Sequence, residues 1–374
     1  MLENSNQAPI RILHYGLTNN LGGIEVFVMS LYRHMDRSKV QFDFISHEGI
    51  YFENEIKKLG GKIYDVPKRR EHFFEYKNQL KKIIRSNKYT AVHVHALAVS
   101  NIDIIKIALK NNVKVILHSH MGMDLRNFRA EVLHKYNRKW LENKKIYRFA
   151  CSTLAAKWIH GENHVQDTII FHNAIDTEKF KYNIQMRNKI RREFNFNDDE
   201  LVIGHVGRFA YQKNQEFLIN IFKEILHICP NSKLLLVGGE GGMMEVSKTL
   251  VDDLNLNNKV IFTGIRDDVN DLMQAMDIFV FPSRWEGLGI VLIEAQATGM
   301  LCFTSDKVPN EAKVTDNLEY ISLEKNYLYW AERILDKYAD FVRKDVQDQL
   351  ISEGYDIYET SSYIQNFYLK LEEE

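Results

Sequence analysis

Short apolar runs rich in β-branched residues alternate with longer amphipathic stretches along the 374-residue chain. In the first half these runs predict six strands, at 10–15, 40–46, 62–66, 91–95, 113–118 and 148–152. Strands that alternate with helical segments are typical of a parallel sheet in which helices form the crossovers. The first half is therefore predicted to be an α/β domain.

The same alternation restarts after the polar, turn-like segment 172–176 and predicts strands at 201–206, 233–237, 260–263, 278–281 and 301–304. A chain of this length is too long for one ordinary core and suits two domains of about 150 to 200 residues. We therefore predict an α/β fold with two Rossmann-like, doubly wound domains facing an interdomain cleft. The expected domains are 1–172 and 173–354, with a C-terminal helix at 355–374 that packs back toward the N-terminal domain.

Composition favours an ordered, soluble protein, because 45% of the residues are hydrophobic and 26% are charged. The three cysteines are far apart, which gives neither a disulfide framework nor a metal-ligand spacing and suits a reducing compartment. No run approaches the roughly 18 apolar residues that span a bilayer, and the polar start lacks the apolar core of a signal peptide. We expect a cytoplasmic protein, peripheral at the inner face of the membrane if it meets one.

The net charge of −1 conceals an asymmetry between the halves. Residues 1–170 carry a formal charge of +11, and the remainder carries −12. A basic half favours an anionic surface or ligand, although solvated helix faces would explain the same count. One basic segment, 68–85, mixes cations with aromatic and aliphatic residues and could rest on an anionic membrane surface. Nucleic acid is not expected as a partner.

The loops that follow strands carry the candidate chemistry, because ligands of doubly wound sheets bind beyond the carboxyl ends of the strands. The Gly22-Gly23 pair follows the first strand and precedes a helix, where the backbone can approach an anion closely. In the second half, Gly207 is followed by Arg208 and Lys213, two cations that could converge on a diphosphate. A bare turn and an ordinary surface loop are the alternatives for these two patterns.

The most informative loop begins after the strand at 278–281 and leads into a helix that starts near Gly289. Glu286 lies in the loop, and Glu294 lies about one turn inside the helix, flanked by apolar residues. Carboxylates accept hydrogen bonds strongly, so Glu286 could bind sugar hydroxyls and Glu294 a ribose diol. The loop amides and the helix dipole would then hold a phosphate.

Together these motifs resemble the retaining glycosyltransferases of family 4, which have the GT-B fold, and among them enzymes of bacterial surface-polysaccharide synthesis. Glu286 and Glu294 match the family's E-x7-E signature, and Gly207-Arg208 with Lys213 matches its GR-x4-K loop. The Gly22-Gly23 loop and the segment 172–180 also match, with Ala174 in place of the usual glycine. The resemblance extends from Arg11 to about Leu335.

The resemblance implies a role for each matching residue. Arg208 and Lys213 would neutralise the donor diphosphate, and Glu294 would bind the ribose. Glu286 and the loop amides would hold the transferred sugar, and Gly23 would face the phosphate. The expected donor-binding residues are Gly23, Gly207, Arg208, Lys213, Ile265, Glu286, Gly287, Leu288, Gly289 and Glu294, and the expected catalytic residues are His120, Arg208, Lys213 and Glu286.

The segment 117–124 resembles the family's active-site histidine loop, and counting along the preceding strand favours His120 over His118. A zinc site built from His93, His95, His118 and His120 is an alternative, but histidines on adjacent parallel strands more often cap the sheet. The chain contains no D-x-D triplet, the usual carboxylate clamp for a Mg²⁺-bound nucleotide sugar. We therefore expect no metal and no cofactor.

The resulting hypothesis is a retaining hexosyltransferase that moves a sugar from a nucleotide-diphosphate donor to a glycan or lipid-linked acceptor in capsule, exopolysaccharide or other cell-surface polysaccharide synthesis. One alternative is a non-catalytic sugar-nucleotide-binding scaffold of the same fold, against which the intact Arg208, Lys213, Glu286 and Glu294 argue. An NAD-linked oxidoreductase fits less well, because no G-x-G-x-x-G follows the first strand.

Overall fold

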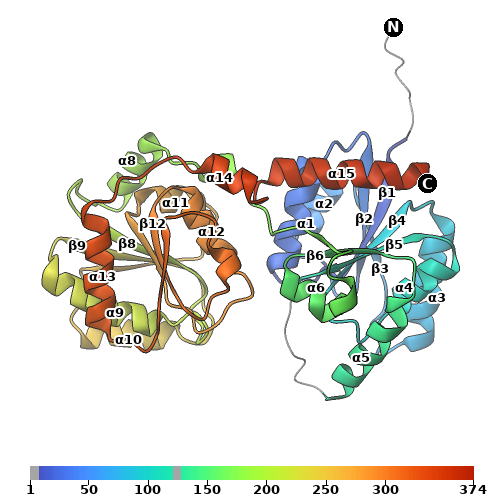
Figure 1. Cartoon of the computed structure of the whole chain (residues 1–374), viewed down its shortest axis with the longest axis horizontal. Helices are drawn as coiled ribbons and strands as arrows, with labels where there is room; N and C mark the ends of the chain where they lie inside the picture. The colour runs from blue at the N-terminus through green and yellow to red at the C-terminus, as the bar shows by residue number, and fades with distance from the viewer. Residues whose placement is uncertain (1–7, 121–127) are drawn as a thin grey trace, which may run out of the picture. The chain divides into compact units, whose positions relative to one another are not determined.

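The computed structural model describes residues 8–120 and 128–374 and divides the chain into two compact units (Figure 1). The N-terminal unit combines Met1–Ala174 with Gly354–Glu374, and the C-terminal unit is Ile175–Glu353. The division after residue 174 lies two residues beyond the expected boundary at 172. The segment from residue 354 onward belongs to the N-terminal unit.

The N-terminal unit is built on a seven-stranded parallel sheet in the order β3-β2-β1-β4-β5-β6-β7. Its strands are β1 Ile10–Tyr15, β2 Val40–Ser46, β3 Lys62–Asp65, β4 Ala91–Ala96, β5 Lys114–Ser119, β6 Tyr147–Ala150 and β7 Ile169–Ile170. Its longer helices are α1 Gly23–His34, α3 Phe73–Ser86, α4 Asp103–Lys110, α5 Phe128–Glu142, α6 Thr153–His160 and α15 Ile357–Glu373, with α2 Glu53–Lys58 and the single turn η1 Glu162–His164 between them.

Both faces of this sheet are covered, which explains why its strands read as nearly continuous apolar runs. On one face, Phe42 and Phe44 pack with apolar residues of α1 and of the C-terminal helix α15. On the other face, Leu13 and Val92 pack with the buried residues of α3 and α4. A hydrogen bond connects α15 to the sheet, since the Tyr368 hydroxyl lies 2.6 Å from Nδ1 of His93 on β4.

The C-terminal unit repeats the design with a six-stranded parallel sheet in the order β10-β9-β8-β11-β12-β13. Its strands are β8 Leu201–Val206, β9 Ser232–Val237, β10 Val260–Gly264, β11 Ile278–Phe281, β12 Leu301–Ser305 and β13 Leu318–Ile321. Its helices are α7 Thr177–Phe180, α8 Ile184–Glu193, α9 Gln215–Ile228, α10 Met244–Asp253, α11 Val269–Ala275, α12 Ile290–Ala297, α13 Tyr327–Ala339 and α14 Gln347–Ser352, with the single turn η2 Asn310–Ala312.

The predicted fold class, two Rossmann-like α/β domains, is confirmed by these two parallel sheets. Four predicted strands have the observed bounds, and seven others differ by one or two residues at one or both ends. Two short strands, β7 and β13, were not predicted. Within the described residues, no helix is both long and apolar enough to cross a bilayer.

Candidate active site

Two loops of the C-terminal unit meet because their strands are neighbours in the sheet. β8 pairs with β11, so the loop 207–214 after β8 lies beside the loop 282–289 after β11. The Arg284 amide donates to the Gln212 carbonyl at 2.8 Å, and the Gln212 side chain donates back to the Trp285 carbonyl at 2.8 Å. The Asn214 side-chain amide donates to the Pro282 carbonyl at 3.0 Å. The structure thus fixes the two predicted donor loops against each other.

An ion pair joins the predicted charged residues of the two loops. The Lys213 Nζ lies 2.7 Å from Oε1 of Glu286, and the side chains are only 19% and 7% exposed. The same ammonium lies 4.6 Å from the centre of the Phe281 ring. A lysine ammonium has three donors, so Lys213 keeps hydrogen-bonding capacity for an anion while Glu286 holds it in place.

Arg208, at the start of the first loop, is exposed to solvent. Its backbone is held, because the Gln215 side chain donates to the Arg208 carbonyl at 2.9 Å. Among residues 8–120 and 128–374, no side chain forms an ion pair with this guanidinium within 4.0 Å. A fixed backbone with an uncommitted guanidinium suits the recognition of a phosphate that arrives from solvent.

The second loop ends at a helix N-terminus that can bind an anion. Gly289 immediately precedes α12 and has φ +79°, a left-handed conformation that favours glycine. No described side chain caps the helix there, so its first N–H groups remain open to a ligand. A Cβ added at Gly287 would meet nothing within 4 Å, and the Leu288 side chain is buried, so a ligand at this loop would meet backbone and not the Leu288 side chain.

Glu294 lies one turn inside α12 in surroundings that disfavour its charge. Burial raises the pKa of this carboxyl group to about 7, and the positive charge of Lys179 on α7 opposes the rise. Glu294 therefore changes protonation near neutral pH. Ile265, the residue expected to contact the base, follows β10 and is 81% exposed. A Cβ at Gly239 would lie 2.7 Å from the Ile265 side chain, so that loop after β9 must remain small.

In the N-terminal unit, Glu25 holds the start of the Gly22-Gly23 loop, a role that the sequence analysis did not predict. Glu25 is only 5% exposed, and its Oε1 accepts hydrogen bonds from the amide and the hydroxyl of Thr18 at 2.8 and 2.9 Å. Gly23 begins α1, with Gly22 as the residue before the helix. The sequence signal was available, since an acid in the first turn of a helix commonly satisfies nearby backbone donors.

His120 follows directly after β5 and is partly exposed, whereas His118 lies inside the strand and is fully buried. Nε2 of His120 lies 2.9 Å from Nδ1 of His95, and Nε2 of His95 lies 2.9 Å from Nδ1 of His14. Although the residue is partly exposed, its ring is enclosed and Nδ1 is buried, which lowers the pKa of His120 to about 3, so the ring is neutral at physiological pH. Residues 121–124 of the predicted histidine loop lie outside the described residues.

The neighbouring histidines form two groups whose ring nitrogens lie within 4.8 Å of one another. They are His14, His93 and His95, and His95, His118 and His120. Neutral imidazoles are the form that binds metals, and burial lowers the pKa of every ring in the cluster. The cluster could hold a metal ion, since its ring-to-ring hydrogen bonds leave Nε2 of His14, Nε2 of His118 and Nδ1 of His120 without a hydrogen-bond partner among the described residues.

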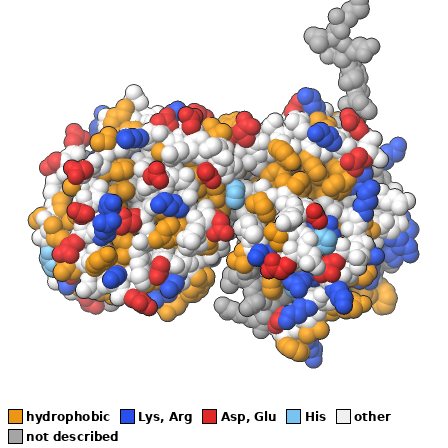
Figure 2. Space-filling model, viewed as in Figure 1, with side chains coloured by type: hydrophobic (Ala, Val, Ile, Leu, Met, Phe, Trp, Pro, Cys, Tyr) orange, Lys and Arg blue, Asp and Glu red, His pale blue; other side chains and the backbone are white. Residues whose placement is uncertain are grey.

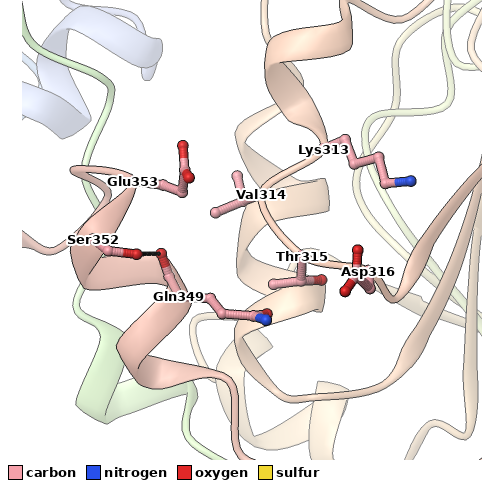
Figure 3. Close-up of a pocket in the computed structure, with 7 residues that line it drawn as sticks. All are labelled: Lys313, Val314, Thr315, Asp316, Gln349, Ser352 and Glu353. Carbon is pink, nitrogen blue, oxygen red and sulfur yellow. Dashed lines mark hydrogen bonds between the residues drawn. The ribbon is translucent and has the colours of Figure 1, made fainter.

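A separate polar hollow of the C-terminal unit lies between the segment 313–316 and α14 (Figure 3). Its lining residues are Lys313, Val314, Thr315, Asp316, Gln349, Ser352 and Glu353. None of the predicted donor-binding residues lines this hollow. Of the predicted site residues, Gly207, Arg208, Lys213 and 286–289 lie in the loops after β8 and β11 of the C-terminal unit. Gly23 and His120 lie in the N-terminal unit.

Comparison with known proteins defines the class to which this fold and site belong. The family model described as Glycosyltransferase Family 4 matches residues 21–179, and the model described as Glycosyl transferases group 1 matches residues 186–352. Solved structures with a similar fold include HepE of Anabaena in complex with UDP, with a TM-score of 0.80 at 16% identity over 96% of this chain and 99% of that chain. That likeness shows the GT-B fold.

Two relatives narrow the assignment. EpsF of Bacillus subtilis (strain 168), by name a glycosyltransferase, is 30% identical over 97% of both chains. The UDP-Gal:alpha-D-GlcNAc-diphosphoundecaprenol alpha-1,3-galactosyltransferase of Escherichia coli is 25% identical over 78% of both chains. The chain belongs to the family 4 glycosyltransferases of the GT-B class, which confirms the resemblance inferred from its motifs.

Proposed function

We propose that the protein is a retaining, metal-independent hexosyltransferase. It transfers a sugar from a nucleotide-diphosphate donor to a glycan or lipid-linked acceptor during the synthesis of a bacterial surface polysaccharide. The observation that carries the proposal is the ion pair between Lys213 and Glu286, formed where the uncommitted Arg208 and the open N-terminus of α12 lie on adjacent loops.

Each part of this arrangement suits one part of the donor. The amides before α12 and the two cations would hold the diphosphate, and they would stabilise the charge that develops when it leaves. Glu286 orients Lys213 and has a second carboxylate oxygen for a sugar hydroxyl. Glu294, in its ionised form, would bind the ribose diol. No D-x-D triplet supplies a metal clamp, and the charges of Arg208 and Lys213 take that role.

The relatives support the choice of substrates. The name of the Escherichia coli relative specifies a uridine-diphosphate galactose donor and a diphosphoundecaprenol-linked acceptor, and HepE was solved with UDP and with UDP-glucose. We infer that a UDP-hexose is the donor and that a lipid-linked sugar is the acceptor. The reaction would then take place at the cytoplasmic face of the membrane.

In the retaining mechanism that we propose, the departing phosphate takes the proton of the acceptor hydroxyl on the face where the donor leaves. The protein contributes orientation and stabilisation of charge, and it needs no dedicated general base. Neutral His120 would donate or accept a hydrogen bond at the transferred sugar without carrying charge. The scaffold alternative has no specific observation in its favour.

Slow hydrolysis of nucleotide sugars by the purified protein tests the proposal without knowledge of the acceptor. A panel of UDP- and GDP-hexoses should reveal one donor that releases nucleoside diphosphate, and the anomeric configuration of the first-formed sugar should match the donor. The matched control for Lys213→Ala is Lys307→Ala. Lys307 is an exposed cation of the same unit, and it pairs only with its neighbour Asp306 among the described carboxylates. Binding of a nucleotide sugar without any turnover, with and without lipid-linked acceptors, would favour the scaffold instead.

A further inference from the structure

Helix α5 departs from the usual arrangement of a surface helix, because it exposes most of its apolar side chains and buries Leu141 near its C-terminal end. Phe128 is 78% exposed and Tyr136 is 68% exposed, while Val132 and Leu133 are each 49% exposed. Phe128, Val132 and Tyr136 recur at every fourth residue, so they share one face of the helix. An apolar stripe of this kind on a soluble domain marks an interaction surface.

The opposite face of α5 is attached to the domain through polar contacts. Nδ1 of His134 accepts from the Val99 amide at 3.1 Å, so Nε2 carries the proton and donates to the Trp158 carbonyl at 3.1 Å. The Asn137 side-chain amide donates to the Val99 carbonyl at 2.8 Å and to the Ser100 carbonyl at 3.2 Å. These bonds fix the rotation of the helix about its axis, and they keep the apolar stripe turned outward.

Cations accompany the exposed stripe. Arg129, Lys135 and Lys139 are exposed, and the helix carries four basic residues against two acidic ones. Lys135 pairs with Glu131 at 2.6 Å, whereas Lys139 forms no ion pair within 4.0 Å among the described residues. Figure 2 shows hydrophobic and basic side chains together at the end of the unit where Figure 1 draws α5. An apolar stripe bordered by lysine and arginine is complementary to a bilayer with anionic headgroups, where rings enter the interface and cations remain at the phosphates.

The basic segment 68–85 is less suited to this task than its sequence indicated. Its helix α3 buries Tyr76, Leu80, Ile83 and Ile84 in the core. Arg69 and Lys77 both pair with Asp103, at 2.6 and 3.3 Å. Phe73 and Phe74 are the aromatic residues that it leaves exposed, at 39% and 81%. The aliphatic side chains of this segment therefore cannot enter a membrane while the domain is folded.

We propose that α5 is a membrane-docking surface that binds an anionic phospholipid bilayer through Phe128, Val132 and Tyr136, with Lys139 at the headgroups. This inference rests on the proposed function insofar as docking would bring the protein to a lipid-linked acceptor. α5 begins eight residues after His120, the predicted catalytic histidine of the same unit.

Vesicle binding of the full-length protein tests the docking surface. Sedimentation with phosphatidylcholine vesicles is compared with sedimentation with vesicles that also contain phosphatidylglycerol, at low and high salt. The wild-type protein should bind the anionic vesicles in a salt-sensitive manner, and Phe128→Ser with Tyr136→Ser should weaken binding about tenfold to a hundredfold, because two rings no longer leave water. Phe74→Ser, an equally exposed ring on α3, is the matched control and should bind as the wild type does.

Three outcomes would overturn the proposal. The first is equal binding to neutral and anionic vesicles. The second is loss of binding in Phe74→Ser but not in the α5 variant. The third is a dimer in light scattering that becomes a monomer in the α5 variant, which would show that the stripe holds two copies of the chain together. All three substituted rings are exposed, so melting temperatures should not change. Donor hydrolysis by the α5 variant should equal that of the wild type. A protein that binds vesicles but hydrolyses no donor would contradict the proposed function and leave the docking surface standing.

Discussion

Replacing Glu294 by glutamine should stabilise the protein above neutral pH. The folded protein raises the pKa of this carboxyl group from 4.5 to about 7 because burial disfavours its charge. Each pKa unit corresponds to 1.36 kcal/mol, so the ionised side chain lowers the free energy of unfolding by about 3 kcal/mol at pH 8. Glutamine has nearly the shape of the protonated acid and does not ionise, so the Glu294→Gln variant should recover most of that free energy.

The stabilisation of Glu294→Gln relative to the wild type should grow as the pH rises. The folded state holds the Glu294 proton more tightly than the unfolded state does. The contribution of this group to the stability of the wild type is therefore greatest below pH 4.5, falls as the pH rises toward 7, and changes little above that. The advantage of Glu294→Gln should therefore shrink to about 1 kcal/mol or less at pH 5.

Urea unfolding at pH 5 and pH 8 measures the difference. Replacing Trp140 and Trp158 of the N-terminal unit by phenylalanine in every variant leaves Trp285 and the buried Trp330 to report on the C-terminal unit by fluorescence. Glu286→Gln is the matched control, because Glu286 is paired with Lys213 and its replacement leaves that partly buried ammonium without its partner. The control should be destabilised, whereas Glu294→Gln should be stabilised. Equal stability of Glu294→Gln and the wild type at both pH values would refute the reasoning.

The remaining predictions concern the donor site. Arg208→Ala and Lys213→Ala should each lower kcat by roughly 10²- to 10³-fold in steady-state assays, since each removes a preorganised charge at the leaving diphosphate; a defect confined to donor KM would contradict this role. Gly289→Ala should cost about 1–2 kcal/mol in unfolding free energy, because alanine is strained at a left-handed φ, and calorimetry should also show weaker donor binding. Donor affinity of the wild type should rise as the pH passes 7 and ionises Glu294, and a titration of Glu294→Gln that rises equally would count against a ribose contact.

Most of the fold could be predicted because its strands are buried on both faces. Short runs rich in β-branched and aromatic residues located β1, β2, β8 and β11 with their observed bounds. β13 was missed because its Leu-Glu-Tyr-Ile sequence mixes polar and apolar residues, as suits the last strand of a sheet. β7 contains only Ile169 and Ile170, too few residues for any periodicity.

The site residues were recognisable as motifs, but their contacts depend on sheet topology. Lys213 and Glu286 are separated by 73 residues, and they meet because β8 and β11 are neighbours in the sheet. The sequence therefore assigned them separate roles and did not predict their ion pair. The outward stripe on α5 was equally hidden, because polar and apolar residues occur on both sides of that helix. Only the bonds of His134 and Asn137 to the chain around Val99 decide which side faces solvent.

The most direct test of the central claim is the release of nucleoside diphosphate from a UDP-hexose in the presence of excess chelator, measured for the wild type, Lys213→Ala and Lys307→Ala. The proposed site requires that the wild type and Lys307→Ala turn over at the same rate with and without chelator, and that Lys213→Ala falls roughly 10²- to 10³-fold below them. Activity that vanishes in chelator and returns with Mg²⁺, or that survives in Lys213→Ala, would contradict a donor site in which the protein's own cations replace a metal.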